Sequence, residues 1–212
     1  TTRATELYRY SNGNTFVSLL SDGTKMREWE DDVACPQHPE SLDVKLTDYC
    51  DMGCRFCHES STVQGKHASM DAVEQLISGL PAGVEVAIGG GNPLDHPDLI
   101  SILEKMRAQG LAPNITINQG HLKPHAKLIR RIIEERLVYG VGISITSRNL
   151  KLLEEPCSLT NNVVFHVIAG VHTPSVIDDL MSVCDPKVLV LGYKQFGRGV
   201  DAWSSETQRR IE

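Results

Sequence analysis

Short apolar runs alternate with longer amphipathic segments from Leu42 to near the end of the chain. Runs rich in β-branched residues favour strands, whereas apolar residues that recur every three or four positions favour helices. The predicted strands are Leu42–Thr47, Glu85–Ile88, Asn114–Asn118, Gly140–Thr146, Val163–Val171 and Val188–Tyr193. The predicted helices between them are Met70–Leu80, Pro97–Gln109, Pro124–Leu137, Leu150–Glu155 and Pro174–Val183.

This alternation predicts an α/β fold built on a parallel sheet. One strand–helix unit recurs roughly every 25–30 residues, a spacing typical of an α/β barrel, and a complete eight-fold barrel takes about 250 residues. Six strands in a chain of 212 residues therefore predict a partial (β/α)6 parallel barrel.

Local signals support the predicted helix ends. Ser69 is a good N-cap for the first helix, and Pro97, Pro124 and Pro174 suit the first turns of three others. Gly110 is a good stop for the second helix.

The first thirty residues follow a different pattern. Glu6–Tyr10, Thr15–Leu20 and Thr24–Trp29 read as strands joined by turns rich in Asn, Asp and Gly, which predicts a β-meander. We therefore divide the chain into an N-terminal β-hairpin extension with its connector (1–40), the partial barrel (41–199) and a C-terminal tail (200–212).

Composition narrows the class of protein. The chain is 41% hydrophobic and 23% charged, with a net charge of −6, which argues against a nucleic-acid-binding surface. No stretch approaches the roughly 18 apolar residues of a membrane span, and the first residues lack the apolar core of a signal peptide. These features predict a cytoplasmic protein without a membrane segment.

Three of the six cysteines, Cys50, Cys54 and Cys57, fall within eight residues directly after the first barrel strand. Clustered thiolates favour an iron–sulfur cluster or zinc, and active sites of α/β barrels collect at this end of the strands. A structural zinc site needs four ligands, and either His58 or His67 is a candidate for the fourth. Three cysteines alone instead leave a coordination position open, as in a catalytic metal centre.

The arrangement C-x-x-x-C-x-x-C, with Phe56 before the last cysteine, resembles the cluster loop of the radical SAM superfamily. A second segment after the second strand, Val86-Ala-Ile-Gly-Gly-Gly-Asn-Pro93, is similar to the Gly-Gly-Glu-Pro-like loop of that family, with Asn92 where Glu is usual. The resemblance implies a [4Fe–4S] cluster on the three cysteines. It also implies that Gly89, Gly90, Gly91, Asn92 and Pro93 contact the methionine part of S-adenosylmethionine.

The ends of the later strands resemble the family less closely. The resemblance implies that Asn118 faces the active site, that Ser144 and Arg148 contact the ribose and carboxylate, and that Leu191 and Tyr193 flank the adenine. The following polar run offers substrate contacts through Lys194, Gln195 and Arg198. His166, a lone histidine among apolar neighbours, is expected to be a hydrogen-bonded core residue.

The implied activity is radical chemistry. In such enzymes a flavodoxin or ferredoxin reduces the cluster, and S-adenosylmethionine chelated to its open iron is cleaved to a 5′-deoxyadenosyl radical. This radical then takes a hydrogen atom from a small-molecule, peptide or protein substrate. The alternative is a non-catalytic zinc or iron–sulfur module.

Overall fold

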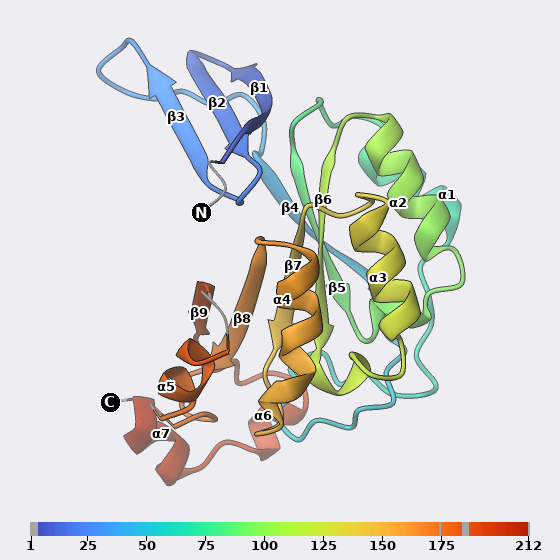
Figure 1. Cartoon of the computed structure of the whole chain (residues 1–212), viewed down its shortest axis with the longest axis vertical. Helices are drawn as coiled ribbons and strands as arrows, with labels where there is room; N and C mark the ends of the chain where they lie inside the picture. The colour runs from blue at the N-terminus through green and yellow to red at the C-terminus, as the bar shows by residue number, and fades with distance from the viewer. Residues whose placement is uncertain (1–3, 174, 184–186, 212) are drawn as a thin grey trace.

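The computed structural model describes residues 4–173, 175–183 and 187–211. Its main element is a six-stranded parallel sheet in the order β4-β5-β6-β7-β8-β9, curved as a partial barrel (Figure 1). The strands are β4 (Ser41–Thr47), β5 (Glu85–Gly90), β6 (Ala112–Asn118), β7 (Gly140–Ser144), β8 (Val163–Ile168) and β9 (Lys187–Leu191). The predicted partial (β/α)6 fold is therefore confirmed.

Helices cover one face of this sheet (Figure 1). They are α1 (Met70–Ile77), α2 (Leu99–Ala108), α3 (Ala126–Glu134), α4 (Glu154–Leu159) and α5 (Ser175–Met181), with the short 3-10 helices η1 (Pro93–Asp95), η2 (Gln119–His121) and η3 (Leu150–Leu153) at the strand ends. Two further helices, α6 (Arg198–Asp201) and α7 (Ser205–Ile211), follow β9. Pro174, the predicted start of a helix, and Cys184 lie outside the described residues.

Several boundaries differ from the sequence prediction for local reasons. Asp98 and His125 are the N-cap residues of α2 and α3, so Pro97 and Pro124 lie just before these helices rather than in their first turns. Strand β8 ends at Ile168, because the chain turns at Gly170, where φ is +80°. Such a φ is readily adopted only by glycine.

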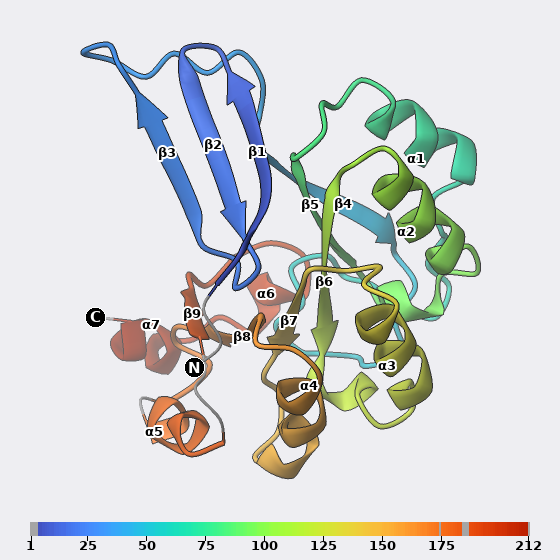
Figure 2. The same ribbon diagram turned by 45° about the horizontal axis from the view of Figure 1, so that its top comes forward.

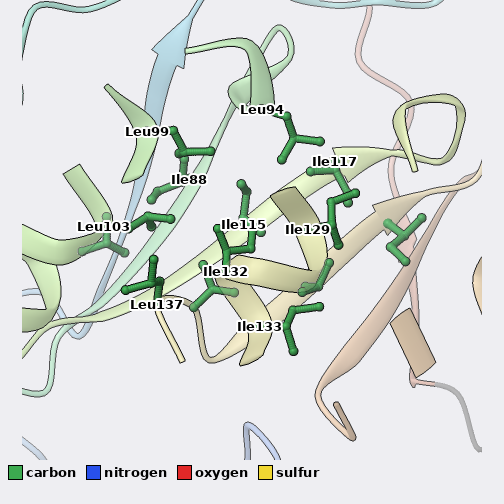
Figure 3. Close-up of a cluster of buried hydrophobic side chains, with 14 of the residues drawn as sticks. Ile88, Leu94, Leu99, Leu103, Ile115, Ile117, Ile129, Ile132, Ile133 and Leu137 are labelled. Carbon is green, nitrogen blue, oxygen red and sulfur yellow. The ribbon is translucent and has the colours of Figure 1, made fainter. Parts of the chain in front are cut away.

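The hydrophobic core lies between the sheet and the helices (Figure 3). Alternate strand residues such as Ile88, Ile115 and Phe165 point into it and are fully buried. Burying each such side chain stabilises the fold by about 1.5–3 kcal/mol. Because strand side chains alternate, their neighbours in sequence lie on the opposite, helix-free face of the sheet.

The N-terminal segment forms the predicted antiparallel sheet, with β1 (Glu6–Asn12), β2 (Thr15–Leu20) and β3 (Lys25–Trp29). It packs on the starts of the barrel strands (Figures 1 and 2). The Tyr8 hydroxyl is 2.9 Å from the hydroxyl of Tyr139, which precedes β7, and Lys25 pairs with Glu85 of β5 at 2.5 Å. The small sheet therefore closes the end of the barrel opposite the strand ends that carry the cysteine loop.

The predicted domain limits at residues 40 and 199 stay predictions. Among the described helices, none combines the length and apolar character that a bilayer crossing requires.

Candidate active site

The cysteine loop leaves β4 at Thr47 and is fixed by backbone hydrogen bonds across its base. The Asp48 amide donates to the Lys66 carbonyl at 2.9 Å, and the Cys50 amide donates to the Thr62 carbonyl at 3.0 Å. Gly53, with φ of +61°, allows the chain to reverse direction between Cys50 and Cys54. The end of β4 and these two backbone hydrogen bonds thus place the three thiols at the carboxyl edge of the sheet.

The three cysteine side chains are half-buried, and burial raises the pKa of the Cys50 and Cys54 thiols. Among the described residues, the three sulfurs do not gather within 4.8 Å of one another as a set. A single zinc ion with Zn–S bonds of about 2.3 Å would hold its sulfurs about 3.8 Å apart. The three thiols are therefore not gathered as a bound zinc ion would hold them.

The two histidines considered as zinc ligands have other partners. His67 Nδ1 lies 2.8 Å from the Thr47 hydroxyl, and His58 Nε2 lies 3.2 Å from Glu59 and 3.4 Å from Lys194. In the part of the chain that the structure describes, the metal-competent group that includes a loop cysteine is Cys50 with Asp51 and His121. Its Asp51 and His121 already pair with each other at 2.8 Å.

Asn118, at the end of β6, reaches the cysteine loop directly. Its amide nitrogen donates to the Cys54 sulfur at 3.7 Å, and its carbonyl accepts from the Thr146 hydroxyl at 2.8 Å. Asn118 thus lies beside the cysteine loop, and its predicted role toward a ligand stays a prediction.

The glycine loop after β5 packs tightly against the cysteine loop. The Gly91 amide donates to the Thr47 carbonyl, and the Asn92 amide donates to the Tyr49 carbonyl, each at 2.6 Å. A Cβ atom at Gly90 would come within 2.4 Å of the Thr47 carbonyl oxygen. These glycines are therefore needed to bring the two loops together.

Gly89 and Asn92 differ in their surroundings. A Cβ atom at Gly89 would meet nothing within 4 Å, so this glycine borders open space on the helix-free face. Asn92 is fully buried, and its side chain donates to Asp95 at 2.8 Å and accepts from the Leu94 amide. Asn92 therefore shapes the loop from inside, and its predicted contact with a ligand stays a prediction.

A row of polar side chains crosses the helix-free face at the level of the thiols. Asn118 of β6 is in register with Ser144 of β7, which is in register with His166 of β8. His166 lies over Gly142, where an added Cβ would be 2.7 Å from its ring. Ser144 and His166 are thus neighbours of Asn118 on one surface.

The expectation that His166 is a hydrogen-bonded core residue is wrong. Its side chain has no hydrogen-bond partner among the described residues, and it points away from the helix-covered core. Burial lowers the pKa of His166, so the ring is neutral at pH 7. The strand alternation that places Phe165 in the core places His166 on the opposite face.

A cavity of about 360 Å³ opens beside the cysteine loop. Phe56 of that loop forms one wall, and the segments after β7 and β8 form the others, with Arg148 and Asp179 at the rim. The remaining lining residues are Ile145, Thr146, Ser147, Leu150, Val171, His172, Thr173 and Val176. This volume is within the size range of small-molecule sites.

The residues after β9 turn back onto the cysteine loop. The Tyr193 hydroxyl donates to the Gly199 carbonyl at 2.7 Å, and the Arg198 side chain donates to the Cys54 carbonyl at 2.9 Å. Leu191 and Gln195 are exposed. The structure thus gives Tyr193 and Arg198 partners within the chain, and the roles predicted for them and Leu191 toward ligands stay predictions.

Two buried residues that hold the segments around the site were not identified from the sequence. His121 is buried, and its Nε2 holds Asp51, next to Cys50, at 2.8 Å, while its Nδ1 has no hydrogen-bond partner in the described part of the chain. Gln119 is fully buried and its carbonyl accepts from the Thr146 and Ser147 amides at 3.1 and 2.9 Å. Both directly follow Asn118, so polar residues beyond a strand end were the available signal.

Comparison with known proteins identifies this arrangement. The sequence matches the Radical SAM superfamily over residues 44–174, more than half of the 212 residues. The match begins in β4 and includes both the cysteine loop and the glycine loop.

Two curated proteins are similar to this chain at low sequence identity. The chain is 25% identical over 191 residues to a probable dual-specificity RNA methyltransferase RlmN of Lachnospira eligens, covering 84% of this chain and 46% of that protein. It is 30% identical over 100 residues to the PqqA peptide cyclase of Gluconobacter oxydans, and this match covers 45% of this chain and 28% of that protein. The chain thus spans less than half the length of these curated relatives.

A solved structure shares the fold. Streptococcus suis SuiB, crystallised with the precursor peptide SuiA, aligns with a TM-score of 0.59 at 16% identity, over 76% of this chain and 40% of that one.

Proposed function

Because the chain belongs to the radical SAM superfamily, we propose that Cys50, Cys54 and Cys57 hold a [4Fe–4S] cluster for the reductive cleavage of S-adenosylmethionine. Family members use an iron–sulfur cluster and S-adenosylmethionine, and the chemistry of this donor set fits such a group. The observation that carries the proposal is the position of three half-buried thiols at the strand edge, on a loop whose first residues are hydrogen-bonded through the backbone to the glycine loop of the next strand.

When bound, the cluster supplies the electron that splits S-adenosylmethionine into methionine and a 5′-deoxyadenosyl radical. The chain contributes binding and orientation. The open space beside Gly89 admits the methionine part to backbone groups of the glycine loop, and Ser144 offers a hydroxyl on the same face. Phe56 and Arg148 line the adjoining cavity, where an aromatic wall suits adenine and a guanidinium suits a carboxylate.

The proposal includes an electron donor and a compartment. A low-potential cluster requires a protein reductant such as flavodoxin or ferredoxin, and its stability requires a reducing environment. We therefore place the enzyme in the cytoplasm.

Anaerobic reconstitution tests the chemistry. The intact chain should take up about four irons and, with dithionite, form 5′-deoxyadenosine from S-adenosylmethionine. Cys54→Ala should abolish this product, whereas Cys35→Ala is the matched control because Cys35 is an exposed free cysteine outside the loop. Zinc uptake without iron uptake, or equal turnover by the two variants, would refute the assignment.

We further propose that the substrate is a peptide or protein. The PqqA peptide cyclase is named for a peptide and SuiB was crystallised with one, and the net charge of −6 opposes RNA binding. Asn118, Ser144 and His166 also offer uncharged hydrogen-bonding groups suited to amides.

Deuterium transfer identifies the substrate class directly. Small-molecule, peptide, protein and RNA fractions from cells grown in heavy water would each be added to the reconstituted enzyme. Deuterium in 5′-deoxyadenosine, read by mass spectrometry, should come from the peptide or protein fraction. Deuterium from the RNA or small-molecule fraction alone would contradict the proposal.

A further inference from the structure

Arg198 makes four hydrogen bonds to the cysteine loop although 144 residues separate it from Cys54. Its side chain donates from Nε to the Cys54 carbonyl at 2.9 Å and from Nη1 to the Ser61 carbonyl at 3.0 Å. Its backbone amide donates to the Cys57 carbonyl and to the Ser60 hydroxyl, each at 3.1 Å. One residue thus holds the loop from its second cysteine to its far end.

The backbone around Arg198 is built for this contact. Gly197 has φ of +53°, and a Cβ there would come within 2.5 Å of the His58 carbonyl oxygen. Gly199 is buried, and a Cβ there would come within 2.3 Å of the Lys194 carbonyl oxygen. A side chain at Gly197 would therefore push against the loop itself, and one at Gly199 would clash with the segment that leads into Arg198.

The chemistry of arginine suits the task. The planar guanidinium carries several donors in fixed directions, so it bridges two carbonyls that a single ammonium group cannot hold in the same way. It also brings a permanent positive charge next to Cys54, since the guanidinium Nε lies 2.9 Å from the carbonyl oxygen of that residue. A cation here stabilises negative charge on the thiolates and on the group they hold.

We propose that Arg198 is a positioning residue that holds the cysteine loop in its cluster-binding conformation and places a positive charge beside the cluster. The inference rests on the proposed function, since it concerns the group that the three cysteines bind. It differs from the role predicted from the sequence, in which Arg198 contacts the substrate.

Three variants of the reconstituted full chain test the proposal. Arg198→Met removes the charge and the two side-chain donors but keeps the stem and the backbone amide, and Arg198→Lys keeps the charge without the planar fork. Arg209→Met is the matched control, because Arg209 is exposed on α7 and, among the described residues, forms no hydrogen bond with the cysteine loop. The measurements are the rate of iron loss to a chelator and the midpoint potential of the cluster, followed by EPR.

Arg198→Met should lose iron at least about tenfold faster than Arg209→Met, because removing a group that orients metal ligands typically weakens metal binding 10- to 100-fold. Its midpoint potential should shift to a more negative value, since the lost cation favoured the added electron. Arg198→Lys should also lose iron faster but keep a midpoint potential close to that of the unmodified protein.

Iron loss from Arg198→Met at the rate of Arg209→Met overturns the positioning role, and an unchanged potential overturns the electrostatic role. If Arg198→Met does not fold, Arg198→Lys still tests the positioning role, because its rate of iron loss must exceed that of Arg209→Met. Failure of the unmodified chain to bind iron refutes the proposed function itself and is thereby distinguished from failure of this inference.

Discussion

The amide of Asn118 donates a hydrogen bond to the sulfur of Cys54 at 3.7 Å, and the Thr146 hydroxyl fixes that amide by donating to its carbonyl at 2.8 Å. Three strand ends therefore cooperate at one thiol, since Cys54 follows β4, Asn118 ends β6 and Thr146 follows β7. Hydrogen bonds to cluster sulfurs raise the reduction potential of iron–sulfur centres. In the proposed cluster, this contact would therefore influence how easily the centre accepts an electron.

We predict that Asn118→Leu lowers the midpoint potential of the reconstituted protein. Thr146→Val removes only the bond that orients the amide, so its potential should fall between those of Asn118→Leu and the unmodified chain. The shifts would be measured by EPR-monitored titration. Equal potentials in all three proteins would show that the amide has no influence on the centre.

Substitution by alanine should affect ligand binding at Gly89 and protein stability at Gly90. Gly89→Ala adds a methyl group to open space, so we expect weaker S-adenosylmethionine binding with an unchanged melting temperature. Gly90 has φ of +116° and no room beside the Thr47 carbonyl, so Gly90→Ala should cost about 1–3 kcal/mol of unfolding free energy. Calorimetric titration with the ligand and chemical denaturation separate the two effects, and full affinity in Gly89→Ala would exclude this glycine from the site.

His166 should titrate below the ordinary histidine pKa of about 6.5. Because burial lowers its pKa in the folded state, its contribution to stability is complete above about pH 6.5 and is lost as the pH falls through the folded-state value. Nitrogen-15 NMR of the imidazole, assigned with His166→Gln, would report the pKa directly. A pKa at or above the unfolded value would show that the ring is not buried as described.

The N-terminal sheet should matter for stability and not for metal binding. Gly83 has φ of +91°, and a Cβ there would come within 2.3 Å of the Tyr10 ring. Gly83→Ala should therefore cost about 1–3 kcal/mol in denaturant unfolding while leaving iron uptake at its normal level. A loss of iron uptake by folded Gly83→Ala would show that the two ends of the barrel are coupled.

The parts of this protein that follow from local pattern were accessible from the sequence. Alternating apolar segments located the six barrel strands, and the spacing of Cys50, Cys54 and Cys57 located the loop, because both signals lie within short windows. The contacts of Arg198 were not accessible, since its partners precede it by more than 130 residues. Only the folded sheet brings the segment after its last strand onto the loop after its first.

The reason for glycine at position 90 also depends on a contact between segments that are separate in the sequence. The sequence indicates a glycine-rich turn after a buried strand, but the reason for glycine is the Thr47 carbonyl oxygen on the neighbouring strand. His166 was misassigned because apolar neighbours in sequence do not reveal which face of a strand lacks a covering layer.

The dependence of the cysteine loop on Arg198 also means that the loop cannot reach its final conformation until Arg198 has been synthesised. A ribosome adds about 5–20 residues per second, so Arg198 is polymerised roughly 7 to 30 s after Cys54. During that interval the nascent chain displays three thiols on a loop that lacks the four hydrogen bonds from Arg198. For the proposed cluster, we therefore expect stable insertion only after Arg198 has been synthesised and has folded onto the loop.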